Sequence, residues 1–419
     1  MNQTVCPGAR TGSVRIPASK SQAHRLLICA ALGAQPVTLR CDGISADIAA
    51  TVRCLRALGA VITDDGAGTL RIVPIAGEMP EHADLLCGES GSTLRFLLPV
   101  VAALGLCAEF KLHGRLAERP LSPLWEELEA HCCTLSRPAP DTVRCEGRLH
   151  AGVFRLPGDV SSQFISGVLF ALPLLPSDSQ IVLTSPAQSR GYIDLTLHAL
   201  AQFGVTAEPA PDGWHIPGGQ RYRSPGRLTV EGDWSNAAFW LCAGAVSGPV
   251  TVTGLAADSA QGDRKIADIL RAFGAEVRQT ADAVTVFPAP LRACEVDVSD
   301  IPDLAPPVAL LAACAAGETR LTGAGRLRIK ESDRLRSIAQ TLRALGIEAA
   351  EGEDSLTVRG GTLTGGLVSS HNDHRIAMLA AIAAGVCRGP ITLRGAEAVK
   401  KSYPRFWTDY RKMTKEVER

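Results

Sequence analysis

Six stretches of the chain share one pattern, in which a short polar loop runs into a nearly continuous run of apolar residues. The loops are rich in serine, asparagine, aspartate and glycine, and the apolar runs that follow are typical of buried helices. The six loop-to-helix starts lie within residues 16–27, 87–98, 156–169, 230–241, 298–310 and 370–379. A helix start presents unpaired backbone N–H groups and a partial positive charge. Each start is therefore a candidate anion site.

A second element recurs between these runs and predicts an amphipathic helix. The segments LRALGA, LEAHCC, LAQFGV, LRAFGA and LRALGI begin about 72 residues apart, at Leu55, Leu128, Leu200, Leu270 and Leu342. Most of them are followed by alternating apolar residues on both sides of an acidic or glycine-containing turn, which predicts a hairpin. We therefore expect repeated units, each with a buried helix, a strand, an amphipathic helix and a hairpin.

The sixth unit is predicted to be divided between the two ends of the chain. After the fifth repeat, the C-terminal segment supplies a helix without room for a hairpin, whereas residues 2–17 supply a hairpin with no helix before it. This closure predicts two domains of three units each, one of residues 19–229 and one of residues 1–18 together with 230–419. If the six helix starts point the same way, we expect them to face one another across a cleft between the domains.

Composition excludes several classes of function. The chain has 419 residues, with 43 basic and 43 acidic, so a general attraction to nucleic acid or to a membrane surface is not indicated. The 13 cysteines form no CxxC pair, and most lie in apolar segments, as buried thiols do in a reducing compartment. The N-terminus lacks an apolar signal core, and no apolar run reaches the ~18 residues of a membrane span. We expect a cytoplasmic protein.

Charged and polar residues concentrate at a few of these helix starts. Lys20 and Arg25 could bind a phosphate or carboxylate, although a serine cap with solvated cations would look the same. Glu331, within RLRIKESDR, could serve as an acid or base, but such segments are more often salt-bridged surface helices. Arg375 in a first helical turn is unfavourable with the helix dipole unless an anion is bound. No metal is predicted, since HxxxH and HExxH spacings are absent and the cysteines do not cluster.

Ten short stretches, read in order, resemble the EPSP synthase family (3-phosphoshikimate 1-carboxyvinyltransferase). They are SKSQAHR, SGSTLR, ERP, SSQF, GYIDLTL, EGDWS, IPD, KESDRL, NDHRIAM and KKSYPRFW, and they span residues 19–407. The resemblance implies an α/β (α+β) class with a two-domain, inside-out barrel-like fold of six βαβαββ units. It also implies transfer of the carboxyvinyl group of phosphoenolpyruvate to the 5-hydroxyl of shikimate 3-phosphate, with release of phosphate. No metal or organic cofactor takes part in that reaction.

The resemblance also implies roles for individual residues. Asp303 is expected to be the base and Glu331 the proton donor, while Lys20 stabilises charge and shares in proton transfer. The residues expected to bind shikimate 3-phosphate are Lys20, Ser21, Arg25, Ser161, Ser162, Gln163, Ser189, Asp303, Arg326 and Lys330. Those expected around phosphoenolpyruvate are Lys20, Gly91, Arg119, Gln163, Arg334, Arg375 and Lys401. Tyr192 is a further candidate for the substrate pocket.

Two other functions remain to be weighed. The sister family, UDP-N-acetylglucosamine carboxyvinyltransferase, shares the fold and the donor but would carry Lys-Asn in the first loop and a reactive cysteine in a mobile loop. Here the first loop has Lys20-Ser21, and residues 111–120 contain no cysteine. The second alternative is a non-catalytic repeat protein that binds phosphorylated ligands, and the joint presence of Lys20, Asp303, Glu331 and Arg375 argues against it. The family habit implies a monomer.

Overall fold

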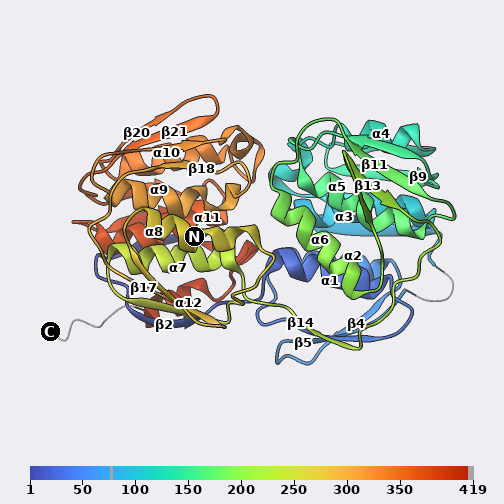
Figure 1. The fold of residues 1–419 in the computed structure, drawn as a ribbon, viewed down its shortest axis with the longest axis horizontal. Coiled ribbons are helices and arrows are strands. Elements are labelled where there is room, and N and C mark those ends of the chain that lie inside the picture. Colours follow the sequence, from blue (N-terminus) through green and yellow to red (C-terminus); the bar gives the residue numbers. More distant parts are fainter. Residues whose placement is uncertain (76–78, 414–419) are drawn as a thin grey trace. The chain divides into compact units, whose positions relative to one another are not determined.

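A computed structural model describes residues 1–75 and 79–413, and the chain divides into two compact units (Figure 1). Unit 1 comprises Met1–Ala18 and Glu231–Arg419, and unit 2 comprises Ser19–Val230. Among the described residues there are six sheets, three in each unit. Each unit is thus built from several small sheets and the helices that cover them.

The three sheets of unit 2 repeat one strand order, in which a parallel pair is extended by an antiparallel hairpin. They are β14-β3-β5-β4 (Arg227–Thr229, Val37–Arg40, Thr69–Val73, Val61–Asp64), β6-β7-β9-β8 (His82–Gly88, Cys107–Leu112, Thr142–Gly147, Cys133–Ala139) and β10-β11-β13-β12 (Val153–Leu156, Ser179–Leu183, Gly213–Ile216, Glu208–Ala210). The helices of this unit are α1 (Lys20–Ala31), α2 (Ala46–Ala57), α3 (Gly91–Leu104), α4 (Leu124–Ala130), α5 (Ser162–Ala171) and α6 (Arg190–Gln202).

Unit 1 repeats this strand order in two of its sheets and has three strands in the other. The sheets are β16-β17-β15-β2 (Glu276–Gln279, Ala283–Phe287, Val250–Thr253, Gly12–Arg15), β18-β19-β21-β20 (Glu295–Asp297, Glu318–Thr322, Ser355–Arg359, Glu348–Glu351) and β1-β23-β22 (Asn2–Val5, Ile391–Arg394, Gly366–Ser369). The helices are α7 (Trp234–Val246), α8 (Ile266–Ala272), α9 (Ala305–Cys314), α10 (Arg334–Ala344), α11 (His374–Ala383) and α12 (Phe406–Lys412).

The predicted helix starts are confirmed, because helices α1, α3, α5, α7, α9 and α11 each begin inside one of the six ranges. Serine or aspartate side chains accept a hydrogen bond from the first turn of five of these helices. The exception is α9, which follows a short 3-10 turn, η4 (Pro302–Leu304), and has no side-chain cap. Asp303 therefore lies in that turn and leaves its carboxylate for other partners.

The expected N-terminal hairpin is wrong. Strand β1 pairs antiparallel with β23, whereas β2 pairs in parallel with β15, so the two strands belong to different sheets. The segment between them is held by the C-terminal helix α12, because Arg10 donates a hydrogen bond of 2.6 Å to Tyr410. The amide of Thr11 also donates to the carbonyl of Met413. The N-terminus still completes the last sheet, but with one strand instead of two.

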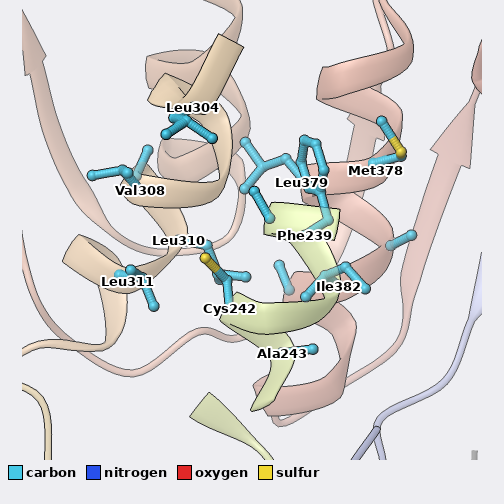
Figure 2. Close-up of a cluster of buried hydrophobic side chains, with 14 of the residues drawn as sticks. Phe239, Cys242, Ala243, Leu304, Val308, Leu310, Leu311, Met378, Leu379 and Ile382 are labelled. Atoms are coloured by element: carbon cyan, nitrogen blue, oxygen red, sulfur yellow. The ribbon is translucent and has the colours of Figure 1, made fainter. Parts of the chain in front are cut away.

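The core of unit 1 lies among α7, α9 and α11. Figure 2 shows Phe239 of α7, Leu310 of α9 and Leu379 of α11 directed toward one another, and all three are fully buried. A helix that is apolar on all sides is packed on all sides, which explains why these segments read as continuous apolar runs. Because the apolar residues of these helices are buried, the polar residues at their N-termini are the ones available to bind solvent or ligands. Within the described residues, no helix has the length and apolarity to cross a membrane.

Candidate active site

A network of guanidinium and carboxylate groups lies in unit 1 where η4, α10 and α11 begin. Arg334, the first residue of α10, contacts three carboxylates. Its Nη1 lies 2.8 Å from Asp303 Oδ1, its Nε lies 2.9 Å from Asp373 Oδ2, and its Nη2 donates to Glu331. Nη2 of Arg375 lies 2.6 Å from the other oxygen of Asp303. Four of the residues assigned from sequence, two arginines and two carboxylates, therefore meet directly.

Asp373 has two roles in this network. Its carboxylate accepts the backbone N–H of Arg375 at 2.9 Å, which caps α11, and it also pairs with Arg334. Ser332 donates a further hydrogen bond of 3.1 Å to the same carboxylate. An aspartate before an apolar helix commonly acts as a cap, so the sequence alone indicates only the first of these roles. The ion pair depends on Arg334, a buried residue of a different helix, which only the fold places beside Asp373.

The charges of this network determine the state of Asp303. Burial alone would raise the pKa of its carboxyl, but the nearby Arg375 and Arg334 hold that pKa well below its usual range. Burial would lower the pKa of Arg334, yet its surrounding carboxylates raise it. Asp303 is thus ionised and a weak base while both arginines remain beside it.

Two further predicted residues adjoin this network, Lys330 as the chain neighbour of Glu331 and Lys401 through a contact with the residue before Asp373. Lys330 directly follows η5 (Gly325–Ile329), which contains Arg326. Burial and the neighbouring Arg326 lower the pKa of the Lys330 ammonium to about 7. Lys401 ends η7 (Ala396–Lys401) and donates from Nζ to the carbonyl oxygen of Asn372 at 2.6 Å.

Asp263 was missed by the sequence reasoning. It lies in η3 (Gly262–Lys265), is 3% exposed, and accepts a short hydrogen bond from Ser235 at the start of α7. Burial and the negative charge of Asp303 raise its pKa to about 7, which Arg375 partly opposes. No motif marks this residue in the sequence, since the segment QGDRK resembles an ordinary surface turn.

The start of α1 in unit 2 carries the predicted Lys20. Its Nζ lies 2.9 Å from Oδ2 of Asp47, and the two side chains are 13% and 14% exposed. Asp47 stands in the first turn of α2, behind the cap Ser45, where the helix dipole favours a carboxylate. The sequence reasoning did not single out Asp47, which holds the ammonium of Lys20 in one place.

Arg25 joins α1 to α6. Its guanidinium donates to the carbonyl of Ser21 at 2.6 Å, to the carbonyl of Tyr192 at 2.8 Å and to Oγ1 of Thr196 at 2.8 Å. Burial lowers its pKa to about 10, so the side chain remains charged at neutral pH. Ser189, which directly precedes α6, is buried and has a left-handed backbone with φ of 56°. Arg25 therefore connects two other candidate positions, Ser21 and Tyr192.

The starts of α3 and α5 form a second cluster in unit 2. Nη1 of Arg95 lies 2.9 Å from Oε1 of Gln163, and Nε2 of Gln163 donates to Ser92 at 3.0 Å. A Cβ placed on Gly91 would lie 2.6 Å from Nη1 of Arg95 and 2.8 Å from Nη1 of Arg119. Two guanidinium groups thus converge on the first residue of α3. Two cations beside a helix N-terminus form an anion site.

Arg95 is the residue of this cluster that the sequence reasoning left unassigned. It is the one charged residue of α3, whose sequence is GSTLRFLLPVVAAL, and it is 3% exposed. A lone cation in a buried helix requires a polar partner, which is the signal that could have found it.

The predicted Ser161 caps α5 by accepting a hydrogen bond of 3.3 Å from the amide of Gln163, and Ser162 is buried beside it.

Replacing Gly91 by alanine is expected to weaken binding at this anion site. The added methyl group would displace the guanidinium groups of Arg95 and Arg119, so we expect KM for the anionic donor to rise by about tenfold, or ~1.4 kcal/mol. Steady-state kinetics measure this, and kcat should change little. Gly361→Ala is the matched control, because its Cβ would meet only Ile347 at 3.4 Å. Equal KM values for Gly91→Ala and the unaltered protein would contradict the assignment.

Comparison with known proteins gives a consistent result over the whole chain. A family model described as EPSP synthase (3-phosphoshikimate 1-carboxyvinyltransferase) matches residues 6–410. A protein of Clostridium kluyveri named 3-phosphoshikimate 1-carboxyvinyltransferase is 41% identical over 420 residues, which cover 99% of this chain and 98% of that protein. A protein of Clostridium acetobutylicum with the same name is 40% identical over 417 residues, covering 98% and 97%.

Solved structures match the fold. The EPSP synthase of Acinetobacter baumannii aligns with a TM-score of 0.80 and 25% identity, covering 99% of this chain and 98% of that one. The enolpyruvyl transferase NikO of Streptomyces tendae aligns with a TM-score of 0.78 and 21% identity, covering 98% and 96%. The predicted two-domain α/β fold class is thereby confirmed.

Proposed function

Because this chain belongs to the EPSP synthase family, we propose that it transfers the carboxyvinyl group of phosphoenolpyruvate to the 5-hydroxyl of shikimate 3-phosphate. The products are 5-enolpyruvylshikimate 3-phosphate and phosphate. The observation that carries the proposal is the family match over residues 6–410. The names of the full-length relatives favour this reaction over transfer to UDP-N-acetylglucosamine and over a non-catalytic role.

The charges of the candidate site support substrates that carry both a phosphate and a carboxylate. We assign phosphoenolpyruvate to the cationic residues of both units and shikimate 3-phosphate to the polar helix starts of unit 2 with Asp303, Arg326 and Lys330. Guanidinium groups suit these anions because their N–H donors match two oxygens at once. The residues assigned to phosphoenolpyruvate are Lys20, Gly91, Arg119, Gln163, Arg334, Arg375 and Lys401. No metal or organic cofactor is assigned.

Substrate binding is expected to raise the pKa of Asp303, because the arginines that pair with Asp303 in the free protein then pair with the substrate. In the free protein Arg334 and Arg375 neutralise its carboxylate and hold its pKa low. When the anions of phosphoenolpyruvate bind to these arginines, less of their charge is left to stabilise the carboxylate. The pKa of Asp303 then rises toward the range in which it can accept a proton. Substrate binding thus prepares the base.

The reaction then needs a proton to leave the hydroxyl, a proton to reach the methylene carbon and a new C–O bond, followed by loss of a methyl proton and cleavage of the C–O bond to phosphate. Asp303 takes the proton of the 5-hydroxyl, and Glu331 gives a proton to the methylene carbon of phosphoenolpyruvate. The oxygen attacks the resulting cation-like carbon and forms a tetrahedral intermediate, whose charge Lys20 stabilises. Glu331, now a carboxylate, takes a proton back from the methyl group as the C–O bond to phosphate breaks, which restores the double bond. The proton held by Asp303 passes to the departing phosphate, so both carboxyl groups return to their starting states. Glu331 contacts Arg334, as Asp303 does, so both proton-transfer groups belong to one network.

The direct test is phosphate release by the purified protein. Shikimate 3-phosphate and phosphoenolpyruvate are supplied separately and then together. Release with both substrates and with neither alone is the expected result. Release with UDP-N-acetylglucosamine in place of shikimate 3-phosphate would instead assign the protein to the sister reaction, and no release with either acceptor would contradict the proposal.

We further propose that the protein is a cytoplasmic monomer. Light scattering tests its oligomeric state, and cell fractionation tests its location.

The lowered pKa of Lys330 predicts that anion binding depends on pH. With a pKa of about 7 in the free protein, this ammonium loses its proton as pH rises from 7 to 9. A bound phosphate dianion favours the charged form, so binding takes up a proton and weakens at higher pH. The ligand phosphate is already a dianion there, since its second pKa is about 6.

We therefore expect KM for shikimate 3-phosphate to rise by about tenfold between pH 7 and pH 9. Steady-state kinetics across this range measure the rise. Lys330→Arg is the informative variant, because its guanidinium stays charged and should flatten the profile. A profile of equal slope in both proteins would show that another group titrates.

A further inference from the structure

Four metal-ligating side chains form a two-by-two arrangement on the exposed face of one sheet of unit 2. Strands β6 and β7 run in parallel, with His82 opposite Cys107 and Asp84 opposite Glu109. In both strands these residues alternate with buried ones, so all four project from the same face. The two members of each opposite pair are 25 positions apart in sequence, because β6 and β7 are joined by α3.

The donor atoms of three of these residues are close enough for one ion, and the fourth residue, Cys107, contacts His82. Single ligand atoms of His82, Asp84 and Glu109 all lie within 4.8 Å of one another. Nδ1 of His82 lies 3.4 Å from Sγ of Cys107, and its Nε2 lies 3.7 Å from Oδ1 of Asp84. A tetrahedral zinc ion holds its donors about 3.5 Å apart. Rotation of exposed side chains therefore suffices, without a change in the strands.

We propose that His82, Asp84, Glu109 and Cys107 bind a divalent transition metal of the zinc class. Imidazole and thiolate donors favour zinc or cobalt over magnesium or calcium, which prefer oxygen ligands alone. Each residue supplies one donor atom, which completes a four-coordinate site. Binding releases the thiol proton of Cys107, because the thiolate is the ligand.

Lys111 competes with the metal for one of these ligands. Its Nζ lies 2.5 Å from Oε2 of Glu109, so the ion must displace an ammonium that already neutralises this carboxylate. Arg144 adds a second cation, with Nη2 3.9 Å from the sulfur of Cys107. Removing the charge of Lys111 should therefore tighten binding, because Glu109 would no longer be paired with an ammonium.

Cobalt and zinc titrations of the full-length, reduced protein test the proposal. We expect one cobalt ion per chain and a thiolate-to-cobalt charge-transfer band, both abolished by excess zinc. His82→Ala and Glu109→Gln should lower the affinity by roughly tenfold or more, and Lys111→Met should raise it severalfold. Cys107→Ser should remove the band. These side chains are on the surface, and circular dichroism checks that the variants are folded.

Matched surface substitutions serve as controls. His150 and Cys132 are also exposed residues of unit 2, so His150→Ala and Cys132→Ser should leave cobalt binding unchanged. Phosphate release without added metal should be the same for His82→Ala and the unaltered protein, because His82 is not part of the candidate active site. Cobalt binding without the charge-transfer band, or an equal loss of affinity in His150→Ala, would overturn the proposal.

Discussion

Asp303→Asn is expected to lower kcat by about 10²–10⁴-fold, the usual contribution of a general base. Asparagine keeps the shape of the side chain and can still accept a hydrogen bond from Arg334 or Arg375, which contact the two oxygens of Asp303. It cannot accept the hydroxyl proton of the substrate. Steady-state kinetics with both substrates measure the loss, and KM should change much less than kcat.

Asp300→Asn provides the control for this substitution. Asp300 lies three positions earlier, is half-exposed, and has Lys265 at 4.0 Å as a weak ionic partner. Its replacement tests whether any change of charge near η4 lowers the rate, and we expect kcat to stay within about twofold. If Asp303→Asn retained near-normal turnover, Asp303 would not be the base, and Glu331 or Lys20 would have to take the proton.

Arg334→Ala is expected to lower the free energy of unfolding by about 3–5 kcal/mol and to abolish turnover. Arg334 is 1% exposed at its side chain and is the shared partner of three carboxylates, of which Asp373 is fully buried. Removing the guanidinium leaves a buried negative charge without its strongest partner, and the cap of α11 depends on the same carboxylate. Urea unfolding followed by circular dichroism measures the change.

Two comparison variants separate charge from geometry at this position. Arg336→Ala removes an arginine of the same helix whose side chain is 58% exposed, so we expect it to lower the unfolding free energy by less than about 1 kcal/mol. Arg334→Lys keeps the positive charge but lacks the planar fork, so it should recover part of the stability and little of the turnover. Equal stabilities for Arg334→Ala and Arg336→Ala would contradict the network described above.

Local signals explain why much of the fold could be predicted. Capped helix starts such as those at Ser19 and Ser90 are read from one polar residue before an apolar run. The hairpin of β4 and β5 is read from DDGAG between alternating strands. The path of β2 could not be read in this way, because a four-residue strand fits either β1 or β15 equally well. The segment that separates β2 from β1 instead contacts the distant helix α12 through Arg10.

The candidate site shows the same division. Residues in recognisable motifs, such as Glu331, Arg334 and Arg375, could be named from sequence. In the structure Arg334 pairs with Glu331, and Asp303 joins Arg334 to Arg375. Asp47 could not, because it is a single polar residue whose partner comes from another helix. Arg95 could be suspected as a lone cation in an apolar helix, but its partner Gln163 could not be read from the sequence. The four residues of the proposed metal site lack metal-binding spacing in the sequence, since only the pairing of β6 with β7 brings them together.

The pairing of β1 with β23 has a consequence for how the protein is made on the ribosome. Residues 2–5 are synthesised long before their partner, residues 391–394. At about 5–20 residues per second, the first strand waits roughly 20–80 seconds for that partner. All of unit 2 is translated during this interval. A nascent chain that stops after residue 230 and before residue 391 therefore contains all of unit 2 but lacks the partner of β1.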